Sequence, residues 1–294
     1  MPWSSSLTRR MVFCWCSDWW CEASSPAKRK RCVHDWKWER EGVYLVTGFS
    51  GVAAITLNNG VAATNCKQLI GQSLVLMGEI GGNDYNHALV AGKSIDEVET
   101  YVPFVINTII SAVNELIELG AQTLVIPGNL PIGCSAAYLT IFYGSDNIQY
   151  DNSTGCIITL NKFAEYHNEL LQRKLQQIRV LHPEVNIIYA DYYNAAMQFF
   201  RSPNKFGFTN GALKACCGGG GPFNYNPSID CADSSSTSCA QPDTYVNWDG
   251  LHLTEAAYKV IFKSIYEGSY TTPQFNTLCP ISTLQWPGGL LSSI

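Results

Sequence analysis

Short apolar runs alternate with long amphipathic stretches over most of the chain, and this alternation restricts the folds that it can adopt. Runs of about five apolar residues bounded by turn residues indicate buried strands, and apolar residues at a 3.6-residue period indicate helices packed on one side. The predicted strands cover residues 73–77, 122–126 and 185–190, and the predicted helices cover residues 103–119, 157–180, 191–200 and 254–266. This order predicts parallel β-α-β units, with helices on both faces of a central sheet.

A segment just ahead of the last predicted helix places a carboxylate and an imidazole three residues apart. Asp249 and His252 flank Gly250, and Thr254 is a suitable helix N-cap with Glu255 in the first turn. A turn there would let the carboxylate fix the imidazole tautomer and stabilise the protonated ring, as a general base requires. An isolated pair with this spacing is more often an ordinary loop histidine that bonds a nearby aspartate.

A second polar segment follows the first predicted strand. Residues 81–84 read Gly-Gly-Asn-Asp, which predicts a tight turn at the carboxyl end of a buried strand. Chemistry in open α/β sheets gathers at that edge, where the amide of Asn83 could donate to a developing oxyanion. Ordinary turn composition explains the same residues without any function.

Together these segments resemble the plant branch of the GDSL esterase/lipase family, which belongs to the SGNH hydrolases. The resemblance covers residues from about 66 to 273. It rests on four stretches, which are Gly-Glu-Ile-Gly-Gly-Asn-Asp-Tyr-Asn at 78–86, Val-Ile-Pro-Gly-Asn-Leu-Pro-Ile-Gly-Cys at 125–134, Lys-Ala-Cys-Cys-Gly-Gly-Gly-Gly at 214–221 and Tyr-Val-Asn-Trp-Asp-Gly-Leu-His-Leu-Thr at 245–254.

The resemblance implies a flavodoxin-like, three-layer α/β/α fold with a parallel sheet, and the hydrolysis of small-molecule or lipid esters. By matching position, His252 would be the general base, Asp249 its orienting partner and Asn83 an oxyanion donor. Such chemistry needs neither a metal nor an organic cofactor. The ester itself and the oligomeric state are left open.

The family's nucleophile block has no counterpart in this sequence. A Gly-Asp-Ser motif is expected after the first strand, yet the string occurs nowhere in the chain. The nucleophile is therefore unknown, and a serine such as Ser50 or Ser73 would have to approach His252. These observations predict a sheet without its first strand and an N-terminus that is truncated or altered. The alternative is a catalytically inactive relative with a binding role or none.

Residues 1–41 differ from the rest of the chain. They hold 8 Lys and Arg against 5 Asp and Glu, six of the eight Trp and four of the twelve Cys, without helical or strand periodicity. We therefore place the hydrolase domain at residues 42–280, with a tail at 281–294. A zinc site at Cys14, Cys16, Cys21, Cys32 and His34, or a nuclear signal at 28–31, is a weaker interpretation. A net charge of −5 gives no reason to expect nucleic acid as a partner.

The remaining cysteines favour an oxidising compartment. Eight lie after residue 65, and four of these fall within 216–239, a loop poor in apolar residues that would gain from cross-links. A bond between Cys134 and Cys156 would close a loop that contains Asn152, the acceptor of a glycosylation sequon. The family is typically exported, whereas this sequence shows no secretory signal and no run as long as a transmembrane helix.

Overall fold

A computed structural model describes residues 11–12, 67–68 and 70–275 of the chain. Within these residues the main sheet has five strands in the order β1-β2-β3-β4-β7, of which the first four run parallel. The strands are Met11–Val12 (β1), Leu74–Leu76 (β2), Thr123–Pro127 (β3), Asn186–Ala190 (β4) and Thr271–Thr272 (β7). The predicted mostly parallel α/β sheet is confirmed. The exception is β7, which pairs antiparallel with β4.

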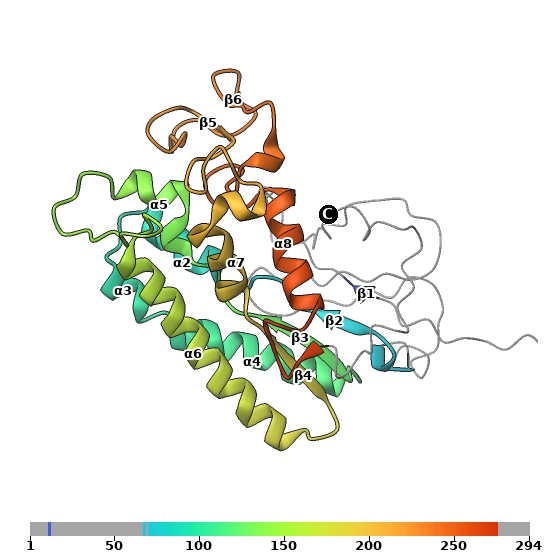
Figure 1. Ribbon diagram of the computed structural model, residues 1–294. Coiled ribbons are helices and arrows are strands. Elements are labelled where there is room, and N and C mark those ends of the chain that lie inside the picture. The colour runs from blue at the N-terminus through green and yellow to red at the C-terminus, as the bar shows by residue number, and fades with distance from the viewer. Residues whose placement is uncertain (1–10, 13–66, 69, 276–294) are drawn as a thin grey trace, which may run out of the picture.

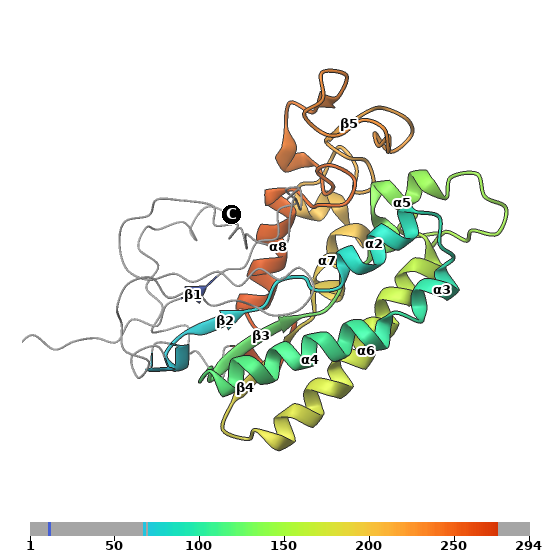
Figure 2. The ribbon, with the colours of Figure 1, turned by 180° about the vertical axis from the view of Figure 1, so that it is seen from behind.

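Helices form a layer on each face of this sheet. The main ones are Val102–Glu118 (α4), Ile158–Leu181 (α6), Tyr192–Arg201 (α7) and Glu255–Tyr266 (α8). Figures 1 and 2 show α4 and α6 side by side on one face, with α7 and α8 on the other. Alternate residues of β3 follow this division, since Leu124 and Ile126 join the core under α4 and α6, while Val125 packs with the end of α8. The three-layer architecture is therefore present.

The long helices form where the apolar period predicts them. In α4, Val105, Ile109 and Val113 recur on one buried side, and each such side chain contributes roughly 1.5–3 kcal/mol when it leaves water. The helix ends before Gly120, whose φ of +104° is a left-handed conformation that glycine adopts without strain. By length and composition alone, Ile95–Glu118 would be long and apolar enough to cross a membrane. Core helices of soluble proteins pass the same test, and α4 buries its apolar side against the sheet and α6.

Shorter helices lie where the sequence indicated turns or an irregular loop. These are Gly82–Val90 (α2), Ile95–Glu99 (α3) and Ala136–Ile141 (α5), with a 3-10 turn at Ile132–Cys134. The prediction of a tight turn at 81–84 is therefore wrong in part, because only Gly81 leaves the helical conformation and the next residues form the first turn of α2. Part of the connection between β3 and α6, for which the sequence shows no periodic pattern, is also helical. Four consecutive residues of α5 are buried, so no amphipathic period marks this helix.

The N-terminal prediction concerns residues that are mostly outside the described part of the chain. The strand β1 lies within 1–41 and pairs with β2 at the edge of the sheet, whereas the family's first strand is expected in its centre. The rest of 1–41, including the cysteines and histidine of the zinc interpretation, is not among the described residues. The same holds for Ser50 and the tail 281–294. The domain boundaries therefore stay a prediction.

Candidate active site

Asp249 and His252 form a compact carboxylate–imidazole pair, as the sequence predicted. The Asp249 Oδ2 atom lies 2.6 Å from His252 Nδ1. The other oxygen, Oδ1, accepts hydrogen bonds from the backbone N–H groups of His252 and Leu251 at 2.8 and 3.1 Å. Gly250 makes this turn possible because its φ is +105°. The aspartate thus shapes the loop and orients the ring at the same time.

The charge state of Asp249 follows from the same contacts. Burial raises the pKa of its carboxyl, but the hydrogen bond with His252, the charge of the imidazolium and the two backbone N–H groups outweigh burial, so the net pKa is lowered. The aspartate is therefore ionised at neutral pH. An anion beside Nδ1 stabilises the protonated imidazole, which is what a general base needs during proton transfer.

The start of α8 fixes the loop that carries this pair. Thr254 caps the helix by accepting from the Ala257 N–H at 3.2 Å, and its hydroxyl donates to the Tyr245 carbonyl at 2.7 Å. The Trp248 N–H donates to the His252 carbonyl at 2.8 Å. These contacts close the loop on itself, so His252 is presented from a rigid support.

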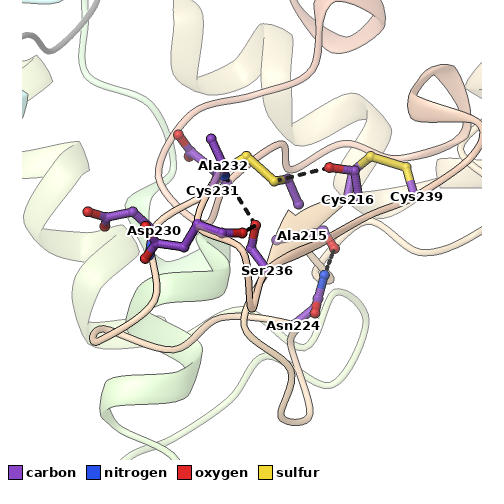
Figure 3. The surroundings of a disulfide bond; sticks show 12 residues. Ala215, Cys216, Asn224, Asp230, Cys231, Ala232, Ser236 and Cys239 are labelled. Atoms are coloured by element: carbon purple, nitrogen blue, oxygen red, sulfur yellow. Dashed lines mark hydrogen bonds between the residues drawn. A yellow bond between two sulfur atoms is a disulfide. The ribbon is translucent and has the colours of Figure 1, made fainter.

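A disulfide-bonded segment braces the loop from its other side. Cys216 and Cys217 pair with Cys239 and Cys231, and their backbone N–H groups donate to the carbonyls of Asn247 and Trp248 at 2.9 and 2.7 Å. Figure 3 shows how closely Cys216, Cys231 and Cys239 lie together. The segment contains the short strands Cys217–Gly218 (β5) and Thr237–Ser238 (β6), and the 3-10 turns Pro203–Phe206 and Pro242–Thr244 flank it. The cross-links that the sequence suggested therefore hold the residues just before Asp249.

The third disulfide joins the 3-10 turn before α5 to the connection between α5 and α6, and the sequon lies on that connection. Cys134 and Cys156 are bonded, as predicted. Asn152 is exposed in the enclosed loop, where Asp151 Oδ1 accepts from the hydroxyls of Ser153 and Thr154. The cysteines at 66 and 279 are outside the described residues. Glycosylation of Asn152 stays a prediction that its exposure permits.

Asn83 lies in the first turn of α2, beyond the carboxyl end of β2. The helix starts against the core because Gly81 has a φ of +104° and any Cβ there would contact Val105 and the ring of His167. His167 in turn bonds the Tyr85 hydroxyl at 2.8 Å and is 1% exposed, so it is a structural histidine of the core. Asn83 is thus presented at the N-terminus of a helix, where backbone N–H groups favour negative charge.

A cavity of about 70 Å³ brings the two motifs to one place. Gly82, beside Asn83, lines it together with Leu251 and Leu253, which flank His252. The other lining residues are Glu79, Asn86, Asn129, Leu130, Pro131, Ile132, Ser135, Tyr138, Phe200 and Asn247. The two loops predicted from sequence therefore border the same space at the carboxyl edge of the parallel strands.

Glu79 is a functional candidate that the sequence did not reveal. Burial raises the pKa of its carboxyl to about 7, and the positive charge of His252 opposes the rise. Burial raises the pKa values of Tyr192 and Tyr258, and the negative charge of the nearby Glu79 raises them further. Glu79 follows β2, whereas these tyrosines lie on α7 and α8, so no local pattern could have shown that they surround it. A carboxyl with a perturbed pKa, in a cavity beside a carboxylate–imidazole pair, is typical of functional sites.

The position of the candidate serines narrows the search for a nucleophile. Ser73 precedes β2, at the opposite end of the strand from the cavity that the His252 loop borders, so the structure does not bring Ser73 to His252. Ser50 is outside the described residues. Ser135 lines the cavity, and its hydroxyl donates to the Gly250 carbonyl at 2.5 Å. The nucleophile stays unassigned.

Known proteins are similar in sequence to most of this chain. Residues 51–265 match the family model of the GDSL-like Lipase/Acylhydrolase. GDSL esterase/lipase At2g27360 of Arabidopsis thaliana is 48% identical over 220 residues, which are 75% of this chain and 56% of that protein. GDSL esterase/lipase At1g28590 of the same plant is 51% identical over 216 residues, 74% of this chain and 54% of that protein. The chain thus spans little more than half the length of these relatives. It belongs to the GDSL-like Lipase/Acylhydrolase family.

Proposed function

We propose that this protein hydrolyses carboxylic esters by a serine-hydrolase mechanism. The observation that carries the proposal is the 2.6 Å contact between Asp249 and the Nδ1 atom of His252, beside a cavity that the Asn83 segment also borders. Membership of a family named for lipases and acylhydrolases supports the reaction class. Acyl lipids, small aromatic esters and acetylated sugars are all compatible with it.

In this mechanism a serine hydroxyl attacks the ester carbonyl while His252 takes its proton. Asp249 stabilises the resulting imidazolium, and the Asn83 amide and neighbouring N–H groups donate to the oxyanion of the tetrahedral intermediate. Collapse of that intermediate expels the alcohol, which receives the proton from His252, and leaves an acyl-serine. A water molecule, deprotonated by the same imidazole, then releases the carboxylic acid and restores the serine.

The alternative is a relative that keeps the cavity without forming an acyl-enzyme. The absence of Gly-Asp-Ser favours it, since loss of a nucleophile removes orders of magnitude in rate. In this case the intact dyad and cavity would bind an ester or its products without turnover.

We also propose that the protein works in an oxidising, extracytoplasmic compartment as a glycoprotein. Three disulfides support this compartment. The exposed Asn152 sequon supports glycosylation. A glycopeptide map of protein isolated from its native tissue tests both, and an unmodified Asn152 together with free thiols would contradict them.

The reaction is tested with the full chain and two histidine variants. Wild-type protein should hydrolyse 4-nitrophenyl acetate and react covalently with a fluorophosphonate, and His252→Ala should lose both properties. His182→Ala is the matched control, because among the described residues its imidazole forms its one ion-pair contact with Glu184, at 3.7 Å and near the surface. Peptide mapping of the labelled protein then identifies the serine. Wild-type protein that neither labels nor hydrolyses esters would support the inactive alternative.

A further inference from the structure

The aromatic ring of Tyr225 packs directly on the backbone of Gly250, within the turn that carries Asp249 and His252. Any Cβ atom on Gly250 would collide with the Cδ2 and Cε2 atoms of this ring. Glycine is therefore needed here for two reasons, since its φ is +105° and the ring fills the space that a side chain would take. The ring thus contacts the residue directly after the aspartate.

A separate segment holds Gly250 through its carbonyl. This oxygen accepts hydrogen bonds from the Ser135 hydroxyl at 2.5 Å and from the Ala137 N–H at 3.0 Å. The two bonds fix the peptide plane that follows Gly250, while the Tyr225 ring packs against its Cα side. The turn is therefore held by two segments that lie outside it.

Tyr225 is itself carried on an anchored backbone. The preceding residue, Asn224, has a φ of 52° and a buried side chain. Its Nδ2 atom donates to the Ala215 carbonyl at 3.0 Å, and its Oδ1 atom accepts from the Gly220 N–H at 3.0 Å. Figure 3 shows the first of these bonds beside the disulfides. Ala215 also forms a β-bridge with Asn247, so the support of the ring is joined directly to the segment before the dyad.

The phenol of Tyr225 lies close to the carboxylate of the dyad. Burial raises the pKa of Tyr225, and the negative charges of Asp249 and Asp230 raise it further. The phenol is therefore neutral at pH 7. The Asp249 side chain is only 25% exposed, and an aromatic ring near it lowers the local dielectric constant. The attraction between this carboxylate and a protonated His252 is correspondingly stronger.

We propose that Tyr225 is a positioning residue, whose ring holds the Asp249–His252 turn in the geometry that proton transfer requires. This inference rests on the proposed ester hydrolysis for its catalytic meaning. A misplacement of about 1 Å can lower a rate by roughly 10²-fold, so a ring that touches no reacting atom can still affect turnover. The Asp249 oxygens already accept from His252 and Leu251, so the ring and not the hydroxyl should carry the effect.

The test measures amide hydrogen exchange in the full chain by NMR. In wild-type protein the amides of Leu251 and His252 should exchange slowly, because Asp249 Oδ1 accepts from both. Tyr225→Ala should raise their exchange rates by about tenfold or more, which corresponds to roughly 1.4 kcal/mol of local stability. The amides of α4 should keep their wild-type rates. Tyr225→Phe keeps the ring and should restore slow exchange.

Tyr143→Ala is the matched control. The exposed Tyr143 ring packs edge-on against Phe223, two residues before Tyr225, so its removal disturbs the same loop and should leave the exchange of Leu251 and His252 unchanged. If Tyr225→Ala does not fold, Tyr225→Leu fills the space without a flat face and should show the same faster exchange. Fast exchange in wild type, slow exchange in Tyr225→Leu or a folded Tyr225→Ala, no restoration by Tyr225→Phe, or an equal rise in the control would each overturn the proposal.

Activity provides a second readout. In a chain that hydrolyses 4-nitrophenyl acetate, Tyr225→Ala should lower kcat on the order of 10²-fold with KM nearly unchanged, and Tyr225→Phe should restore kcat. A rise in KM with an unchanged kcat would indicate a substrate contact and would contradict a positioning role. The exchange measurement needs no turnover, so a chain without esterase activity still decides this question separately from the proposed reaction.

Discussion

The stability of this protein should respond to pH through a buried histidine and a half-buried glutamate, whose effects have opposite signs. Burial lowers the pKa of His167 from 6.5 to about 4. Between these two pH values the imidazole is therefore protonated in the unfolded chain and neutral in the folded protein. Stability from this group is present above pH 6.5 and is lost as the pH falls toward 4. Burial raises the pKa of Glu79 from 4.5 to about 7, against the opposing charge of His252. This group makes the folded protein more stable as the pH falls from 7 toward 4.5.

The two contributions are similar in size. A pKa difference between the folded and unfolded states changes the free energy of unfolding by about 1.4 kcal/mol per unit. For His167 this gives a loss of about 2 kcal/mol in the free energy of unfolding between pH 7 and pH 5. The same calculation gives a gain of about 2 kcal/mol from Glu79, which is an upper figure because solvent reaches part of its side chain. In the wild-type protein the two nearly cancel, so neither is visible until the other is removed.

Urea unfolding at pH 7 and pH 5 separates them. Glu79→Gln should lose about 2 kcal/mol more than wild type on going to pH 5, and His167→Gln should gain about as much relative to wild type. Glutamine at 167 can still bond the Tyr85 hydroxyl, and comparing pH dependences cancels any constant cost of the substitution. An identical pH dependence in the wild type and both variants would refute the assigned protonation states.

Two further predictions concern the dyad and its brace. Asp249→Asn should lower kcat on 4-nitrophenyl acetate on the order of 10²–10⁴-fold, because the new amide donates to His252 Nδ1 and fixes the wrong tautomer. An unchanged kcat, or an equal loss in the exposed control Asp243→Asn, would count against the dyad. Cys217→Ala combined with Cys231→Ala opens a loop with a sequence separation of 14 and should lower the free energy of unfolding by about 3 kcal/mol in denaturant titration. If the free energies of unfolding of the double variant and the wild type differ by less than roughly 0.5 kcal/mol, about the error of such a titration, the disulfide contributes little.

The features predictable from sequence were those set by local pattern. The helices α4, α6 and α8 carry clear apolar periods. The turn at Asp249 is closed by hydrogen bonds within four residues, so the short sequence segment contains every residue that forms it. Asp191 at the start of α7 was also recognisable, and its side chain does accept from the Asn194 N–H at 3.0 Å. The pairing of Cys134 with Cys156 was suggested by the loop between them.

The features that escaped prediction depend on residues far apart in the chain. Glu79 looked like part of a loop, and its perturbed pKa arises from α7, α8 and the His252 segment together. In the sequence, Asn129 is simply a polar residue after Pro127. Its place in the cavity wall depends on its hydrogen bond with Asn168 on α6, which is distant in the chain. The helix α2 was hidden because glycine, asparagine and aspartate favour turns and helix starts alike.

The contact between the Ser135 hydroxyl and the Gly250 carbonyl joins positions 115 residues apart, and it has a consequence for how the protein acquires its site. The chain loses conformational entropy when it closes such a long loop, and this cost comes before the contact can stabilise the fold. Pairing of parallel strands that are far apart in the chain carries the same kind of entropic cost. No shorter piece of the chain can therefore assemble the cavity in advance. Binding of a probe in that cavity would therefore report completed folding. A nascent chain whose segment around Gly250 has not yet left the ribosome would not bind the probe.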